Sequence, residues 1–173
     1  MHPFYPKLVQ FGRDYDFEGL VWESYNIDRR LLQRITRADA QQIGERVRKS
    51  IDNTAIEKAI AALPPEWRAR TSDVAKLRSR LRARRDLIPE VSSDFYDWLA
   101  TEVDVHATDE KDRAEIERLN DGRVTVTIHG RGDSRSATPF FNRTFEPAET
   151  REVRVFMTSH TLAGGASIST VIS

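Results

Sequence analysis

The triplet Asp104-Val105-His106 carries two metal-binding side-chain types one residue apart. On a strand both side chains project from one face, which is how a metallophosphoesterase presents its first two metal ligands. A two-metal site needs several further ligands, typically including an Asn-His pair on another loop, and this sequence contains no such pair. We therefore predict no metal site and place Asp104 and His106 on the solvent face of an amphipathic strand. Metal binding by this pair stays open as the alternative.

Arginines recur along residues 72–88, where the sequence predicts a helix. Arg78, Arg82 and Arg85 are spaced three and four residues apart and would share one helix face. Their guanidinium groups could grip a phosphate or a carboxylate. The alternative is that this helix face is exposed to solvent and that the aliphatic parts of the arginine side chains cover apolar surface. We prefer this second interpretation. No aromatic residue lies between these arginines, which argues against stacking on nucleic-acid bases.

Several classes of chemistry are excluded by the composition and the motifs. Cysteine is absent, which removes disulfides, thiolate nucleophiles and cysteine metal ligands. The sequence contains no phosphate-binding glycine loop, no Gly-x-Ser-x-Gly elbow and no His-Glu-x-x-His helix. We therefore expect neither enzymatic activity nor a cofactor. No stretch approaches the roughly 20 apolar residues of a membrane span, so we expect no transmembrane segment, and we see no signal peptide after Met1.

Charge is balanced over the chain and unevenly distributed along it. The 27 Lys and Arg residues equal the 27 Asp and Glu residues, so the net charge argues against a nucleic-acid ligand. Residues 28–88 hold 16 basic and 8 acidic residues, whereas residues 89–121 hold 3 and 11. We interpret this as a basic helical half beside an acidic segment. The alternative is a basic face that binds phosphates, nucleic acid or an acidic partner.

The sequence predicts that the secondary-structure elements that position the candidate residues begin with helices. Residues 1–27 are rich in aromatic residues and predict an irregular segment that wraps over a core or over a missing neighbour. Residues 28–101 predict a helical region in which Ile43, Val47 and Ile51 form one apolar stripe. Pro89 predicts a kink or the start of a new helix. Predicted helix N-terminal signals are Asp28, Thr36 with Asp39, Asp52-Asn53, and Ser72.

From about residue 102 the apolar period changes from 3.6 to 2, which predicts strands through residue 157. The loop Asn120-Asp121-Gly122 predicts a hairpin. A three-residue loop with Gly122 in the left-handed conformation pairs Ile116 with Val126 and Ala114 with Ile128, so we prefer this register. Residues 158–173 predict a flexible tail. The expected fold is α+β: a helical N-terminal two-thirds followed by a small antiparallel β-sheet of hairpins.

Several stretches resemble the middle region of large bacterial envelope proteins. The strongest are Leu63-Pro64-Pro65-Glu66, Leu81-Arg82-Ala83-Arg84-Arg85-Asp86 and Glu102-Val103-Asp104-Val105-His106-Ala107-Thr108-Asp109. Weaker matches lie at residues 5–12, 17–22, 28–32, 144–147 and 149–154. Those proteins carry a kinase-like segment upstream and a BamA-like surface-antigen barrel downstream, sometimes with a metallophosphoesterase domain. None of the matching stretches is a catalytic motif.

The resemblance implies that the chain is a piece of a longer protein. After Met157 the sequence departs from the pattern of that family. It implies a periplasmic or outer-membrane-associated setting and partners among neighbouring domains or other envelope proteins. We expect a non-catalytic connecting or interaction module. One alternative is the C-terminal remnant of a kinase-like or metallophosphoesterase-associated enzyme without its catalytic motifs. Another is an anion- or nucleic-acid-binding module that uses the basic helical half.

Overall fold

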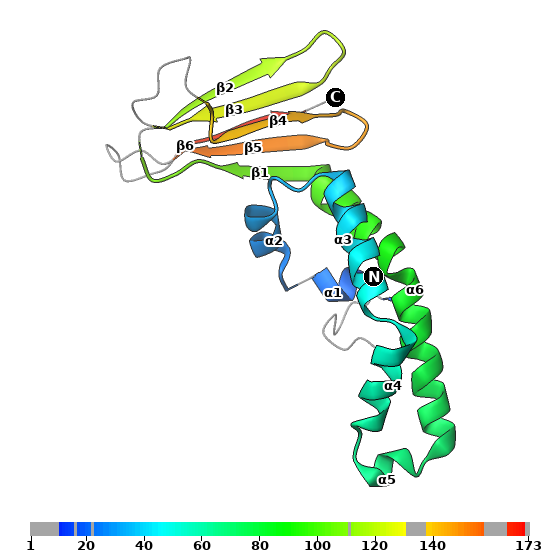
Figure 1. The fold of residues 1–173 in the computed structure, drawn as a ribbon. Helices are drawn as coiled ribbons and strands as arrows, with labels where there is room; N and C mark the ends of the chain where they lie inside the picture. The colour runs from blue at the N-terminus through cyan, green and yellow to red at the C-terminus, as the bar shows by residue number, and fades with distance from the viewer. Residues whose placement is uncertain are drawn as a thin grey trace. The chain divides into compact units, whose positions relative to one another are not determined.

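The computed structural model describes residues 11–15, 17–21, 23–110, 112–130, 138–157 and 166–171. The chain divides into two compact units. A helical unit comprises Met1–Tyr25 and Ile35–Tyr96, and a β unit comprises Asn26–Arg34 and Asp97–Ser173. The α+β class is confirmed, because helices precede a set of short strands (Figure 1).

The helical unit contains α1 (Phe17–Val21), α3 (Arg37–Ser50), α4 (Asn53–Ala61), α5 (Pro65–Arg68) and most of α6 (Thr71–Thr101). The helices α4 and α6 run side by side and are joined through α5 (Figure 1). We call this arrangement the α4–α6 hairpin, and the turn at α5 its tip.

Two of the predicted helix starts are confirmed. Thr36 caps α3, and its amide donates to the Asp39 carboxylate at 2.9 Å while its side chain accepts from the Asp39 amide. Asp52 caps α4 by accepting from the amide of Ala55 at 2.7 Å. Both caps join residues three apart, which is why local sequence predicts them.

The predicted caps at Asp28 and Ser72 are wrong. The helix α2 (Tyr25–Leu31) begins earlier, so Asp28 lies in its first turn. The helix α6 begins at Thr71 directly after the α5 turn. The carbonyl of Arg70 accepts from the amides of Asp73 and Val74, so a backbone group closes the first turn of α6.

The apolar stripe predicted on α3 is not the buried face of that helix. Ile43 and Val47 are 41% and 38% exposed, whereas Ala40 and Gly44 are buried. A Cβ atom on Gly44 would lie 3.2 Å from the Cα of Pro89 and closer still to Ser92. The small residues therefore form the face along which α3 approaches α6. Pro89 lies inside α6, so the alternative of a new helix there is wrong.

The described residues of the β unit form two three-stranded sheets. The first has the order β1 (Glu102–His106), β5 (Glu152–Met157) and β6 (Ala166–Val171). The second is an antiparallel meander of β2 (Arg113–Arg118), β3 (Val124–His129) and β4 (Phe141–Phe145). One apolar cluster joins the inner residues of both sheets. Its buried members are Val103, Val105, Val124, Val126, Ile128, Phe141, Phe145, Val153 and Val155.

The hairpin between β2 and β3 has the predicted register. Ile116 lies opposite Val126 and Ala114 lies opposite Ile128. Leu119 donates its amide to the carbonyl of Arg123 at 2.8 Å, which leaves a three-residue loop. Gly122 in that loop has φ +87°, the left-handed conformation that the register requires.

Two features of the sheets differ from the sequence expectations. The strand β1 pairs in parallel with β5, with Val103 opposite Val153, instead of joining a hairpin. This pairing brings valines from distant parts of the chain into one core. The segment predicted as a flexible tail contains β6, which pairs antiparallel with β5.

Candidate functional site

The predicted arginine face of α6 is directed at α4. Arg78 donates from Nε and Nη2 to the two carboxylate oxygens of Glu57, at 2.8 and 3.1 Å. Arg82 donates from Nη2 to the same carboxylate at 3.1 Å. Arg85 donates to the side-chain oxygen of Asn53 at 2.8 Å and also pairs with Asp86. The three arginines therefore fasten α4 to α6.

These contacts also set the protonation of their partners. The hydrogen bond from Arg78 holds the pKa of Glu57 below its usual value, and Glu57 raises the pKa of Arg78. The hydrogen bond from Arg85 lowers the pKa of Asp86. All of these groups are therefore ionised at neutral pH.

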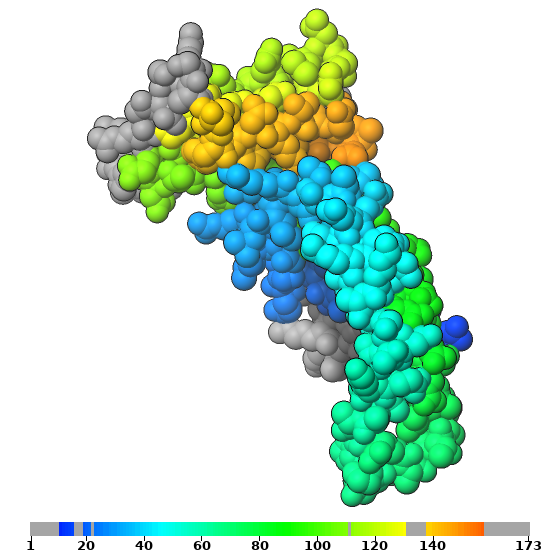
Figure 2. Space-filling view, viewed as in Figure 1, coloured from blue at the N-terminus to red at the C-terminus, as the bar shows by residue number. Residues whose placement is uncertain are grey.

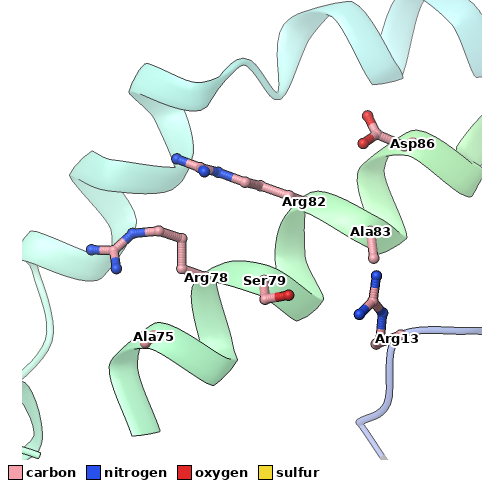
Figure 3. A pocket seen from close by; sticks show the side chains of 7 residues that line it. All are labelled: Arg13, Ala75, Arg78, Ser79, Arg82, Ala83 and Asp86. Atoms are coloured by element: carbon pink, nitrogen blue, oxygen red, sulfur yellow. The ribbon is translucent and has the colours of Figure 1, made fainter. Parts of the chain in front are cut away.

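Beside this contact lies an open cavity of about 410 Å³, which we call the arginine pocket (Figure 3). Its lining includes two of the predicted residues, Arg78 and Arg82, but not Arg85. The full lining is Arg13, Ala75, Arg78, Ser79, Arg82, Ala83 and Asp86. Arg13 belongs to the aromatic N-terminal segment, and no local pattern links it to α6.

Arg13 reaches the pocket because Arg84 fixes the segment that carries it. The guanidinium of Arg84 lies over the rings of Phe11 and Tyr15 and donates to the carbonyl of Asp14 at 2.8 Å. The aromatic residues predicted to wrap over a core thus contact α6 at these two positions. Phe4, Tyr5 and Trp22 lie outside the described residues.

Asp104 and His106 share one face of β1, as expected, but that face is partly covered and both residues are half-buried. Asp104 accepts from Arg154 Nε at 2.7 Å, and its other oxygen lies 3.8 Å from Arg29 Nε. The amide of His106 donates to the side chain of Gln33 at 2.8 Å. Arg29 and Gln33 therefore cover part of this face, which corrects the prediction that it is a solvent-exposed face.

The surroundings of Asp104 and His106 suit a structural role. Burial lowers the pKa of His106, with a further contribution from Arg30, and the ring stacks on Phe156 at 4.7 Å. Two arginines already neutralise Asp104. Within the described part of the chain, no group of three or more His, Asp or Glu side chains is arranged to hold a metal ion.

A second cavity, of about 360 Å³, lies at the tip of the α4–α6 hairpin, and we call it the tip pocket. Apolar side chains from α6 and from the turn between α4 and α5 line it, and Trp67 of α5 lies beside them with 64% of its surface exposed. The lining residues are Leu63, Trp67, Arg70, Asp73, Val74 and Leu77. Figure 2 shows no other segment over this end of the helical unit on the side in view. Sequence patterns predicted only that a helix ends at Pro64-Pro65.

Comparisons with protein-family models, with curated proteins and with solved structures found no match to this chain. Among the helices that the structure describes, none has the length and apolar character needed to cross a bilayer.

Proposed function

We propose that the chain is a non-catalytic interaction module of a larger bacterial cell-envelope protein, and that the tip pocket receives an apolar side chain from a polypeptide partner. The observation that carries the proposal is the exposed ring of Trp67 beside the apolar lining of this pocket. The partner is a neighbouring domain of the same protein or another envelope protein. The setting follows from the resemblance to envelope proteins.

The tip pocket has the composition of an interface hot spot. Leu63, Val74 and Leu77 supply an apolar floor, and the exposed ring of Trp67 supplies a large surface that a partner can bury. Tryptophan is enriched at such positions, and residues that contribute little binding energy but exclude water typically surround them. Arg70 and Asp73 form such a rim here. Burying the remaining surface of the indole contributes about 2 kcal/mol to association.

The charges at the tip favour a polypeptide over an anionic membrane surface. Arg68 and Arg70 would attract anionic lipid headgroups. The acidic residues Glu66 and Asp73 lie in the same part of the chain as these arginines and would repel the same headgroups. A peptide that carries one acidic and one basic residue beside its apolar anchor satisfies both rim charges. A cavity of about 360 Å³ has room for the anchor.

The test is a selection of random 12-residue peptides that bind the immobilised chain. Peptides that also bind the immobilised Trp67→Ala variant are removed in a subtraction step. Selected peptides should carry a large apolar residue flanked by an acid and a base. Calorimetry on such a peptide should show affinity at least tenfold weaker for Trp67→Ala and nearly unchanged for Trp67→Phe. Ile43→Ala is the matched control, because it removes an exposed apolar side chain on α3.

Two outcomes would overturn the proposal. One is a selection that enriches the same peptides on the wild type and on Trp67→Ala. The other is binding of the chain to vesicles of anionic phospholipid that is lost on Trp67→Ala while no peptide binds, since this would assign the tip to a membrane surface.

A further inference from the structure

We propose that the outer edge of β2 (Arg113–Arg118) is a self-association surface, which pairs antiparallel with β2 of a second copy of this chain. This goes beyond the proposed interaction function, because β2 lies in the β unit and contains no residue of the tip pocket. The two proposals therefore fail independently of each other, and Trp67→Ala should leave the pairing of β2 unchanged.

The strand β2 lies at the edge of its sheet. In the order β2-β3-β4 it has a hydrogen-bonded neighbour on one side only, as Figure 1 shows. Leu119 donates its amide to the carbonyl of Arg123 across the hairpin. Because the backbone groups of successive residues point to alternate sides of a strand, those of Ala114 and Ile116 point away from β3. Among the residues that the structure describes, none bonds to these groups, and such groups are a template for another strand.

The first sheet shows how this chain covers a strand edge elsewhere. Arg29 donates to the carbonyl of Glu102 at the edge of β1 that faces away from β5. Further along the same edge, the amide of His106 donates to the side chain of Gln33 at 2.8 Å. Two side chains thus occupy the backbone groups of β1. The edge of β2 has no comparable cover within the described ranges, so it is the edge that a second copy can reach.

The inner face of β2 leaves an apolar side chain exposed at this edge. Ile116 lies opposite Val126, which is fully buried, yet Ile116 itself is 36% exposed. Ala114, on the same face, packs against the apolar cluster of the β unit. A further strand beside β2 would cover Ile116 and extend this cluster by one more row of side chains.

The charges of β2 are self-complementary in one register. When Glu115 lies opposite its own copy on a two-fold axis, Arg113 lies opposite Glu117 of the second copy, and this contact forms twice. In the same register Ala114 lies opposite Ile116 of the second copy and covers it. Because the backbone groups of both residues face the edge, each such pair exchanges both of its N–H···O bonds.

The neighbouring registers are less favourable. Placing Ile116 opposite its own copy sets Glu115 against Glu117 twice, and these like charges repel. The opposite shift sets Ile116 against Asp112, so that an apolar side chain meets a carboxylate. In the proposed register only the contact of Glu115 with its copy joins like charges. Arg113 lies 3.3 Å from Glu115 within each strand and weakens that repulsion.

The experiment measures the dissociation constant of the dimer by sedimentation equilibrium. Concentrations should run from about 1 μM to about 1 mM, because a pair of short strands forms a small interface and hence a weak dimer. Unfolding experiments at a few micromolar then report the monomer. Circular dichroism melts of each variant check that it folds.

A charge swap tests the register. Arg113→Glu and Glu117→Arg should each weaken the dimer at least about fivefold, because each turns both favourable contacts into like-charge contacts. The double variant carries the same net charge as the wild type and restores the contacts with reversed signs, so its dissociation constant should return to within about threefold. Arg80→Glu is the matched control, since it makes the same charge change at an exposed position on α6, and it should alter the dimer less than about twofold.

Ala114→Pro tests the backbone pairing itself. Proline lacks an amide N–H, and at this position the lost group points away from β3, so the hydrogen bonds within the sheet are retained. The bond to the second copy is lost, and the dimer should weaken at least about tenfold.

Three outcomes would overturn the proposal. One is a chain that stays monomeric up to about 1 mM. Another is a dimer that the double charge variant does not restore or that a folded Ala114→Pro variant leaves unchanged, because the contact would then lie outside β2. The third is loss of the dimer in Trp67→Ala, which would assign the second copy to the tip pocket.

Discussion

The guanidinium carbon of Arg84 lies 3.9 Å from the centroid of the Tyr15 ring, so a residue in the middle of α6 holds a segment near the N-terminus. The same group lies 5.0 Å from the ring of Phe11 and donates to the carbonyl of Asp14. Three contacts from one side chain thus fasten residues 11–15 to the helical unit.

Arg84→Ala should therefore lower the free energy of unfolding by about 1 to 2 kcal/mol, since it removes cation–π contacts and one charge-assisted hydrogen bond. Urea denaturation measures the change. Amide exchange in residues 11–15 should accelerate in the variant, because the segment loses its attachment. Arg80→Ala, at an exposed position one turn away, should change stability by less than about 0.5 kcal/mol. Similar losses in the two variants would contradict the assigned role of Arg84.

Glu102 lies at the centre of an ionic cluster in the β unit. Arg29, which is 4% exposed, donates to its carboxylate at 3.1 Å, and Arg151 donates to the other oxygen. Burial alone would raise the pKa of Glu102, but the bonds from Arg29 and Arg151 outweigh it and hold the pKa below the usual value. The charged form of Glu102 therefore stabilises the folded state.

A carboxyl group with a lowered pKa in the folded state stabilises the protein above its unfolded-state pKa, for which the ordinary value of a glutamate, 4.5, is the reference. That contribution is lost as the pH falls through the lower pKa of the folded state. Glu102→Gln should cost about 2 kcal/mol at pH 7, because it leaves the buried Arg29 with less countercharge. The difference from the wild type should shrink toward about pH 3. Denaturant titrations at both pH values test this, and a difference independent of pH would contradict it.

The matched control for the acid dependence is Glu117→Gln. Glu117 is an exposed acidic residue on β2. Its replacement should change stability by less than about 0.5 kcal/mol at either pH.

Features that depend on neighbours in sequence could be predicted, and features that depend on distant parts of the chain could not. The Thr36–Asp39 cap and the three-residue loop at Gly122 follow from side-chain and backbone chemistry within a few residues. The parallel pairing of β1 with β5 joins strands some 50 residues apart, and no local pattern distinguishes it from a hairpin.

The candidate sites illustrate the same division. Helical spacing correctly placed Arg78, Arg82 and Arg85 on one face, but it could not reveal that Glu57 and Asn53 of α4 meet that face. Arg13 lines the pocket because Arg84 contacts the residues on either side of it. The spacing of residues along the sequence does not predict those contacts. Trp67 lies in a single helical turn too short to show periodicity.

The burial of α3 is a case in which local hydrophobicity pointed to the wrong residues. Ile43 and Val47 are the larger apolar residues, yet Ala40 and Gly44 face the core. The reason is the close approach of α3 to α6 at Pro89, which admits only small side chains on the facing surface.

Gly44→Ala tests this close approach directly. Alanine would gain up to about 1 kcal/mol of helix propensity in the middle of α3. A Cβ atom at this position would lie 2.7 Å from Ser92 Oγ and 2.9 Å from Ser92 Cβ, closer than packed atoms allow. The clash should outweigh the propensity, so we expect a net loss of about 1 to 2 kcal/mol in the free energy of unfolding.

The controls for Gly44→Ala separate the clash from other effects of removing glycine. Gly12→Ala adds a Cβ atom whose nearest neighbour among the described residues is the backbone nitrogen of Asp14 at 3.9 Å, so it should not destabilise the protein. Replacing Ser92 with glycine removes both clashing atoms, so the double variant should recover part of the loss. The contact with Pro89 Cα at 3.2 Å remains in that variant and limits the recovery. A Gly44→Ala variant more stable than the wild type would mean that α3 and α6 lie farther apart here, and the small-residue face would lose its explanation.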